Sequence, residues 1–376
     1  MSRARAGAAL AFALLLISTP ALASSPGVGG RAYYVENAAT GEVLLQRNAR
    51  QRVPIASITK LMTVLVALEH ARLDDVVVVT KHAAAVGESS IYLRPGDRLT
   101  VRELVEAALI QSANDAAVAL ADYTSHGRRG QFVAWMNAKA RAFGLRDTHF
   151  VNPDGFDARG HYSSARDVTR LGEIAMRNPV VRSAVRRTGA VISGGRRLHT
   201  WNDLLYTFPG VIGVKTGHTG AAGWSEVAAA TGSQGVTVYA TLLGARTRAQ
   251  RNADLTKLLA FGLSRYRIVR VVQPRRVYAT AAVPYGKTPL ALVAARPATR
   301  VVRIDRTLRE RVVSTRVVSL PVVRGERMGE VRVYSRGKVI ARVPLVASRS
   351  ISRPGVIGRI GWYAGRTAHH AWSWIS

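Results

Sequence analysis

Apolar and polar residues follow two regular patterns through the first half of the chain. Two apolar runs flank Ala39-Thr40-Gly41 within residues 31–48, which is typical of a β-hairpin. From residue 56 onwards, apolar residues recur at the spacing of one helix face. The same spacing over residues 100–143 predicts further helices, with a break near Gln111–Asn114.

Strands and helices alternate in the next part of the chain. A loop rich in Gly and Asp, residues 152–167, runs into a predicted helix over 164–177. Residues 210–232 and 236–245 predict strands with a glycine-rich bend, and residues 251–266 predict a closing helix. This part therefore combines helices with strands in one region.

The pattern changes near Val269. Short Val-rich segments, separated by Gly, Pro and Arg, indicate a small all-β sandwich. Pro354 and Gly355 end this region, and a last segment, residues 356–376, follows.

The N-terminus has the pattern of an export signal. Two arginines precede the apolar run at residues 6–17, and the small residues Ala21 and Ala23 follow it. This arrangement predicts a signal peptide over residues 1–23, with cleavage after Ala23. The run is short for a membrane span, so an uncleaved anchor is the alternative. We expect the rest of the chain to work outside the cytoplasm.

Composition narrows the chemistry. The chain has no cysteine, and its nine histidines form no H-x-x-x-H pair, so we expect neither a metal nor another cofactor. Its net charge is +31, and residues 266–376 hold 22 basic and 4 acidic residues, or +18 of that total. Such a charge suits nucleic acid, anionic lipid or an anionic polymer. The export signal argues against nucleic acid.

The segment PIASITKLMT places Ser57 three residues before Lys60. In isolation, Ser57 is a plausible helix N-cap. However, side chains at i and i+3 share a helix face, so Lys60 could also take the proton of the Ser57 hydroxyl. That role requires a neutral amine, and burial or a nearby cation lowers a lysine pKa. Lys215 is the expected cation.

Two further motifs favour the catalytic interpretation. QSANDA contains Ser112 and Asn114 at the predicted helix break, and GVKTGHTG contains Lys215, Thr216 and Gly217 on a predicted strand. An S-x-x-K, S-x-N and K-T-G set in this order is typical of class A β-lactamases and penicillin-binding proteins.

Together with NPDGF, GHYSSARD and WNDLL, these motifs make the chain resemble the low-molecular-weight penicillin-binding proteins, the serine D-alanyl-D-alanine carboxypeptidases. The resemblance implies an α+β fold: an antiparallel sheet with flanking helices and a helical lobe, followed by a small β-sandwich. It implies a catalytic domain over residues 30–265, a β-rich domain over 268–350 and a membrane-associating tail over 354–376.

The resemblance also implies roles for individual residues. Ser57 would be the nucleophile, Lys60 its base, and Ser112 a proton carrier to the leaving amine. Asn114 would bind the peptide amide of the substrate. The expected contacts for the rest of the substrate are Lys215, Thr216, Gly217 and Arg251, with the backbone N–H groups of Ser57 and His218 as the oxyanion hole. For Arg251, a solvated helix arginine is the alternative. Asp167 is expected to be structural, and Trp201 stands where some relatives have an arginine.

The implied reaction removes the terminal D-alanine from peptidoglycan stem pentapeptides through an acyl-enzyme, which penicillins would also form. A DD-endopeptidase that cuts peptidoglycan cross-links is the main alternative. A β-lactamase of class A needs a glutamate for deacylation, and residues 144–166 contain none. A non-catalytic wall-binding protein would need no base.

The last segment predicts a helix that lies in a membrane interface. At helical spacing, apolar residues gather on one face, and two arginines and two histidines gather on the other. Arginines suit anionic lipid. The alternative is an arm that packs on the sandwich or frays at its three glycines.

Overall fold

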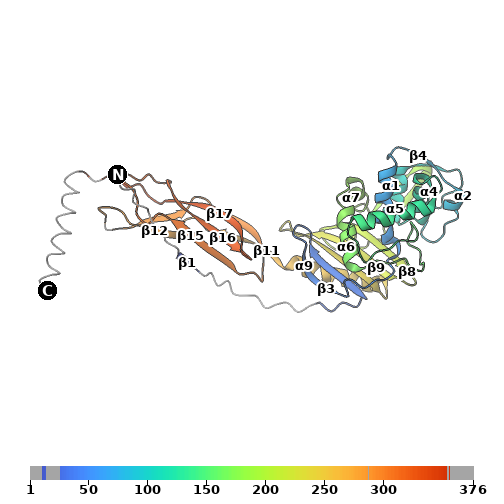
Figure 1. Cartoon of the computed structure of the whole chain (residues 1–376), viewed down its shortest axis with the longest axis horizontal. Helices are drawn as coiled ribbons and strands as arrows, with labels where there is room; N and C mark the ends of the chain where they lie inside the picture. Colours follow the sequence, from blue (N-terminus) through green and yellow to red (C-terminus); the bar gives the residue numbers. More distant parts are fainter. Residues whose placement is uncertain (1–10, 14–25, 287, 354, 356–376) are drawn as a thin grey trace. The chain divides into compact units, whose positions relative to one another are not determined.

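This computed structural model describes residues 11–13, 26–286, 288–353 and 355. The chain divides into two compact units, described separately below (Figure 1). One unit is Ala23–Arg265, and the other joins Tyr266–Ser376 to Met1–Leu22.

A five-stranded antiparallel sheet forms the centre of the first unit. Its strands, in spatial order, are β3 (Glu42–Arg47), β2 (Ala32–Asn37), β10 (Thr237–Ala245), β9 (Gly223–Thr231) and β8 (Val211–Thr219). The predicted hairpin is confirmed as β2 and β3, and Gly41 takes a positive φ of 63° in its turn. β8 lies at one edge of the sheet.

Two helices cover opposite faces of this sheet. Gly262 of α9 (Arg248–Ser264) lies against Val238, and Thr169 of α6 (Ala165–Ala175) lies with its hydroxyl oxygen 2.6 Å from that of Thr241. Successive side chains of a strand point to opposite faces. Val238 and Thr241 are three residues apart on β10, so α9 and α6 must pack on different faces.

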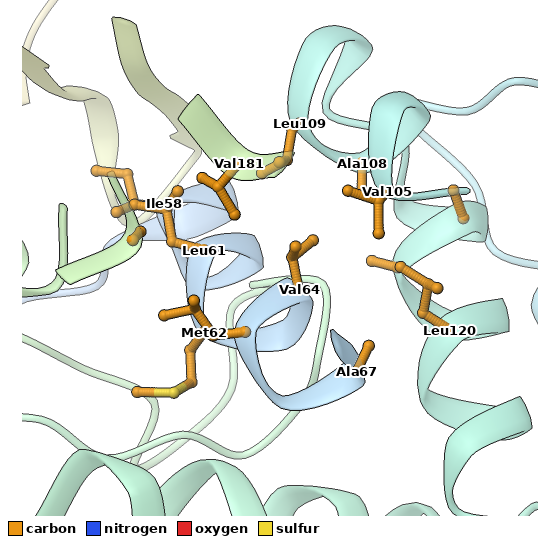
Figure 2. Close-up of a cluster of buried hydrophobic side chains, with 14 of the residues drawn as sticks. Ile58, Leu61, Met62, Val64, Ala67, Val105, Ala108, Leu109, Leu120 and Val181 are labelled. Carbon is orange, nitrogen blue, oxygen red and sulfur yellow. The ribbon is translucent and has the colours of Figure 1, made fainter. Parts of the chain in front are cut away.

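A helical lobe surrounds α1 (Lys60–His70). Figure 2 shows Leu61, Met62 and Val64 of α1 among apolar side chains of neighbouring helices. The elements that line or flank this lobe are α2 (Lys81–Ala84), α3 (Val101–Glu106), α4 (Asn114–Thr124), α5 (Arg129–Ala142) and α7 (Pro179–Ala184). Leu61 and Val64 are fully buried, so packing fixes the start of α1.

The predicted break in the helices is confirmed. A π-helical turn, η2 (Ala107–Gln111), follows α3, and Ser112 then takes a left-handed conformation with φ 66° before α4 begins. This conformation costs free energy in a residue that has a side chain, and it is found mostly where a site requires it. Short elements complete the unit: β4 (Val76–Val78), β5 (Arg98–Thr100), β6 (Gly189–Ile192), η3 (Ser193–Gly195), β7 (Arg196–His199) and α8 (Leu204–Thr207).

The second unit is built from strands, as the Val-rich pattern predicts. A six-stranded antiparallel sheet has the order β1-β15-β16-β17-β13-β12, and a two-stranded ribbon, β11 with β14, packs against it. The strands are β11 (Tyr266–Val272), β12 (Val277–Ala281), β13 (Leu290–Ala294), β14 (Ala298–Arg303), β15 (Leu308–Ser314), β16 (Arg327–Ser335) and β17 (Lys338–Ala347). Its separate apolar core includes Val272, Leu292 and Val331.

Both ends of the chain lie largely outside the described residues. Of the predicted signal peptide, only β1 (Ala11–Ala13) is described, and it pairs with the edge of β15 rather than lying apart from the fold. Cleavage after Ala23 stays a prediction. The tail is described only at Gly355. Among the residues that the structure describes, no helix is long and apolar enough to cross a membrane.

Candidate active site

Ser57 lies in a short 3₁₀ turn, η1 (Ala56–Thr59), directly before α1. The residues that cap η1 and α1 are Ile55 and Thr59, and neither helix receives a side-chain cap bond. The helix-cap interpretation of Ser57 is therefore wrong. Ala56 takes a positive φ of 50° although it has a side chain and is buried. This strained turn presents the half-buried Ser57 to a cavity.

The amine of Lys60 is fully buried and surrounded by three oxygen atoms. Lys60 Nζ lies 2.7 Å from each of Ser57 Oγ, Asn114 Oδ1 and the backbone oxygen of Asp154. A neutral amine has two N–H groups and one lone pair. The two carbonyl oxygens can only accept hydrogen bonds, so they hold the two N–H groups and leave the lone pair facing the Ser57 hydroxyl.

Burial lowers the pKa of Lys60 from 10.5 to about 8. The nearby carboxylates of Asp154, Asp115 and Glu88 act in the opposite direction and raise this pKa. Burial is the larger effect because no water reaches the amine. Lys60 can therefore be substantially neutral under mildly alkaline conditions, which is what a base requires.

A second buried lysine lies beside the first. Lys215 Nζ of β8 donates to Ser112 Oγ at 2.8 Å and to the backbone oxygen of Thr216 at 3.0 Å. Burial, and next the positive charge of Lys60, hold the pKa of Lys215 well below its usual value. The charge of Lys60 therefore acts on Lys215, whereas the lowered pKa of Lys60 is caused by burial and not, as the sequence had suggested, by Lys215. In this structure the Ser112 hydroxyl is hydrogen-bonded to Lys215.

Asn114 connects the lysine to the opposite wall of the site. Its Oδ1 accepts from Lys60, and its Nδ2 donates to the backbone oxygen of Gly87 at 3.0 Å. Its own backbone N–H donates to the oxygen of Ser89 at 2.7 Å. The next residue, Asp115, is fully buried and accepts hydrogen bonds from Ser90 and from the backbone beyond it. These bonds fix the segment 87–93 beside the start of α4.

The loop 151–155 forms the floor of the lysine pocket. His161 is buried, and its Nδ1 accepts from the N–H of Val151 at 3.2 Å, so Nε2 carries the proton that points to Thr59 Oγ1 at 2.8 Å. Burial lowers the pKa of His161 to about 4, which keeps it neutral. A Cβ at Gly155 would lie 2.1 Å from the backbone oxygen of Ala56. The loop and the Ser57 turn therefore pack with no room between them.

These elements enclose a cavity of about 220 Å³. The residues that line it are Ser57, Glu88, Ser89, Ser112, Trp201, Thr216, Gly217, His218, Trp224 and Arg251. The structure thus brings together Ser57, Ser112, Thr216, Gly217, His218 and Arg251 at one cavity, with Lys60, Asn114 and Lys215 behind it. Within the described ranges, no group of three or more His, Asp or Glu residues could hold a metal ion.

Gly217 is required by the close packing of β8 against the Ser57 turn. In the structure, a Cβ at Gly217 would lie 2.7 Å from the backbone oxygen of Ile55 and 3.1 Å from the nitrogen of Ser57. Glycine therefore lets β8 approach the Ser57 turn and places the Ser57 N–H next to His218.

Arg251 is a buried residue of the site and not a solvated helix arginine. Only 1% of its surface is exposed, and its Nε lies 3.1 Å from Oε2 of the fully buried Glu226. Its Nη2 also donates to Asp203 Oδ2 at 3.3 Å. Burial raises the pKa of Glu226 to about 7, although the charge of Arg251 opposes this shift. These carboxylates hold Arg251 toward the cavity.

Sequence motifs did not assign a role in the site to several lining residues. Trp224 stacks on the exposed His218 ring, with ring centroids 4.0 Å apart, and Trp201 donates from Nε1 to the oxygen of Gln111 at 3.0 Å. Glu88 and Ser89 come from a segment with no recognisable motif. The structural role expected for Asp167 is consistent with its buried carboxylate, which accepts from the N–H of Asp147 at 2.7 Å.

Comparison with known families identifies the chain. Residues 20–247 match the model of a family described as D-alanyl-D-alanine carboxypeptidase. The chain belongs to the D-alanyl-D-alanine carboxypeptidase family. It is therefore a serine-type peptidase, and the family resemblance of the motifs is confirmed.

Alignments with individual relatives cover nearly the whole length of this carboxypeptidase. It is 32% identical to the D-alanyl-D-alanine carboxypeptidase DacF from Bacillus subtilis over 334 residues, 85% of each chain. It is 31% identical to DacC from Escherichia coli over 370 residues, which cover 94% of this chain and 92% of that one.

Solved structures confirm the α+β fold. Penicillin binding protein 5 from Haemophilus influenzae matches with a TM-score of 0.64 and 26% identity, over 88% of this chain and 99% of the other. The Streptomyces K15 DD-transpeptidase matches with a TM-score of 0.61 and 33% identity, over 64% of this carboxypeptidase and 99% of the other chain.

We predict that Gly217→Ala damages the site without unfolding the protein. The added Cβ must displace the Ser57 turn or β8, and a shift of about 1 Å at a reacting group can cost roughly a hundredfold in rate. The measurement is kcat/KM on a peptide ending in D-Ala-D-Ala. Gly220→Ala is the matched control, because a Cβ there meets no atom within 4 Å. Equal activity in both variants would contradict the packing argument.

Proposed function

We propose that this carboxypeptidase removes the terminal D-alanine from peptidoglycan stem pentapeptides through an acyl-enzyme on Ser57, and that the unit Ala23–Arg265 carries the catalysis. The observation that supports this most is the buried Lys60 amine, 2.7 Å from Ser57 Oγ, with a pKa near 8. A serine hydroxyl needs a neighbouring base to become nucleophilic, and Lys60 is in position to be that base.

In the acylation step, the lone pair of neutral Lys60 takes the proton of the Ser57 hydroxyl. Ser57 Oγ then forms a bond to the carbonyl carbon of the penultimate D-alanine, and the carbonyl oxygen becomes an oxyanion. The backbone N–H groups of Ser57 and His218 lie on either side of Gly217 and are suited to stabilise that charge.

Breakdown of this intermediate requires a proton on the leaving nitrogen. Ser112 Oγ accepts a hydrogen bond from Lys215, so its own proton is free to point into the cavity. We assign Ser112 to donate that proton to the departing D-alanine and to recover one through the lysines. Water then attacks the ester carbon, Ser57 leaves with its proton restored, and the shortened peptide is released.

The substrate carboxylate needs cations, and the site provides two. Lys215 and Arg251 are both buried beside the cavity, and Thr216 lines it with a hydroxyl group. A carboxylate bound here would compensate the charge of Lys215, which is costly in a dry pocket, and would add to the Glu226 and Asp203 partners that Arg251 already has. Asn114, next to Lys60, would bind the peptide on the other side of the scissile bond.

Product analysis separates this reaction from the alternatives. A carboxypeptidase releases free D-alanine from a pentapeptide, whereas a DD-endopeptidase would release a peptide from a cross-linked dimer. The Streptomyces K15 structure carries the name DD-transpeptidase, so transfer to an amine acceptor is a further outcome to test. Mass analysis of products from each substrate, with and without an added amine, distinguishes the three.

We predict that penicillin adds its whole mass to Ser57, because serine attack opens the lactam and leaves an ester. Ser57→Ala should lose both this adduct and carboxypeptidase activity. Ser89→Ala is the matched control, because Ser89 lines the same cavity but its hydroxyl donates to the backbone oxygen of Gln111 and does not contact Lys60. Intact-mass spectrometry followed by peptide mapping gives the answer. An adduct that persists in Ser57→Ala would remove Ser57 from the mechanism.

The acylation rate should depend on pH through Lys60. Burial lowers its pKa to about 8, and only the neutral amine accepts a proton. The rate should therefore fall about tenfold for each pH unit below this value and level off above it. Lys60→Arg should be inactive at every pH, because arginine stays protonated. A rate that is flat from pH 6 to pH 9 would contradict the role of Lys60.

We further propose that the enzyme is exported across the cytoplasmic membrane to the periplasm or cell-wall side, where it is peripherally attached to the membrane. The predicted signal peptide and the basic composition of residues 266–376 support this location. The sequence beyond residue 354 predicts a helix with an apolar face and an arginine-bearing face, which would suit an anionic lipid surface.

We predict that deleting residues 354–376 from the mature enzyme releases it from vesicles of anionic lipid. Turnover of soluble peptides should not change, because the catalytic residues belong to another unit. Vesicle sedimentation of both forms measures the effect, with neutral-lipid vesicles as the control. Equal binding of both forms would show that the basic β-rich unit, and not the tail, holds the lipid.

A further inference from the structure

One buried carboxylate behind the catalytic cavity has no part in the proposed reaction. Glu226 lies on β9 directly opposite Thr216 of β8, so the two side chains share one face of the sheet. Thr216 and Arg251 line the cavity, and Arg251 meets Glu226 from α9. Glu226 therefore lies behind two of the side chains that we expect to hold the substrate carboxylate.

The carboxyl group of Glu226 receives no hydrogen bond. The residue is fully buried, and neither of its oxygen atoms has a hydrogen-bond partner among the residues that the structure describes. Arg251 Nε lies 3.1 Å from Glu226 Oε2, but it directs its N–H to Asn252 Oδ1 at 3.0 Å. An ionised carboxylate without hydrogen bonds is costly in a dry site, so burial raises the pKa of Glu226 to about 7.

The charged groups that act on Glu226 come from α9, from β8 and from the segment before α8. They are Arg251, Lys215 and Arg248, which favour its ionised form, and Asp203, which opposes it. On the other side, β10 places the apolar Leu242 opposite Glu226. His218, two residues beyond Thr216 on β8, is the other titratable group at this wall of the cavity.

The second carboxylate beside Arg251 behaves differently. Although burial acts to raise it, hydrogen bonds from Arg248 and Asn252 lower the pKa of Asp203 below its usual value. Asp203 is therefore ionised throughout the pH range in which Glu226 gains or loses its proton. Of the two carboxylates that face Arg251, Glu226 is the one that changes its charge near neutral pH.

Arg251 is shared between this buried wall and the cavity. Its Nε and Nη2 donate to Asn252 and its Nη2 also donates to Asp203, whereas its Nη1 donates to no residue that the structure describes. A substrate carboxylate that bound to this guanidinium would place a second negative charge close to Glu226. Two like charges beside one cation weaken each other's binding.

We propose that Glu226 is a positioning residue whose protonation sets how strongly Arg251 holds the terminal carboxylate of the substrate, so that substrate capture weakens as the pH rises. This inference rests on the proposed function. Below about pH 7, Glu226 is neutral and the charge of Arg251 acts on the substrate; above it, ionised Glu226 repels the substrate carboxylate. By reciprocity, a bound substrate raises the pKa of Glu226.

The test compares the wild type with Glu226→Gln, which keeps the shape of the neutral side chain and cannot ionise. KM and kcat are measured separately from pH 5.5 to pH 8 on Nα,Nε-diacetyl-L-lysyl-D-Ala-D-Ala. The ratio of the wild-type KM to the variant KM should be about one at pH 5.5 and should rise roughly three- to tenfold by pH 8, as expected for coupling between two charges in one site. The corresponding ratio of kcat should stay constant, because Lys60 titrates in both enzymes and its effect cancels.

Glu173→Gln is the matched control. Burial raises the pKa of Glu173 as well, to about 8, but this carboxylate belongs to α6, which covers the other face of the sheet. Its KM ratio should stay near one at every pH, since it lies away from Arg251. Loss of any titrating carboxylate near the sheet would therefore not reproduce the effect.

A KM ratio that stayed near one at every pH in Glu226→Gln would overturn the role of Glu226, and a pH dependence common to both enzymes would then belong to His218. If circular dichroism showed that the variant does not fold, the wild type would decide: its KM should rise with pH, while the inhibition constant of the same peptide ending in D-alaninamide should not. An equal rise for both peptides would contradict the proposal. If the wild type cleaved no peptide and took no penicillin label, the proposed function would fail, and this role with it.

Discussion

The catalytic site of this enzyme depends on the burial of one amine, that of Lys60. Lys60 Nζ is closed off from water and meets three oxygen atoms, two of which are carbonyls that can only accept hydrogen bonds. A charged ammonium is costly there, and a neutral amine has one direction left for its lone pair, toward Ser57. The same geometry therefore sets the protonation state and the orientation of the base.

The fold supplies this pocket from segments far apart in the chain. The strained turn at Ala56 and the buried face of α1 present Ser57 and Lys60, the break before α4 provides Ser112 and Asn114, and the loop at Asp154 closes the floor. β8 then brings Lys215 beside Lys60. Two buried lysines cannot both stay charged without a counter-ion, so an arriving substrate carboxylate is favoured by charge as well as by shape.

Residue spacing predicted much of this arrangement, because the catalytic side chains can be read directly from the sequence. The i, i+3 spacing put Ser57 and Lys60 on one helix face, and the helix break marked Ser112. The contact with the Asp154 backbone oxygen could not be predicted in this way, since every residue has such an oxygen and the sequence does not show which one faces the site. Gly217 was identified from its motif, but its close approach to Ile55 could not be predicted, because Ile55 is distant in the chain. Glu88 was missed because it belongs to no motif, and bonds of its neighbours to Asn114 bring it to the cavity. The export signal and tail lie largely outside the described residues and stay predictions.

The most direct test of the account is a titration of Lys60 itself. The chain has only seven lysines, so NMR spectra of enzyme labelled with ¹³C at lysine Cε give few signals, and Lys60→Arg assigns one of them. The account predicts that the Lys60 signal titrates near pH 8, well below the ordinary lysine value of about 10.4. A Lys60 signal that titrates together with the exposed lysines would contradict it, because the amine would then remain charged wherever the enzyme is active.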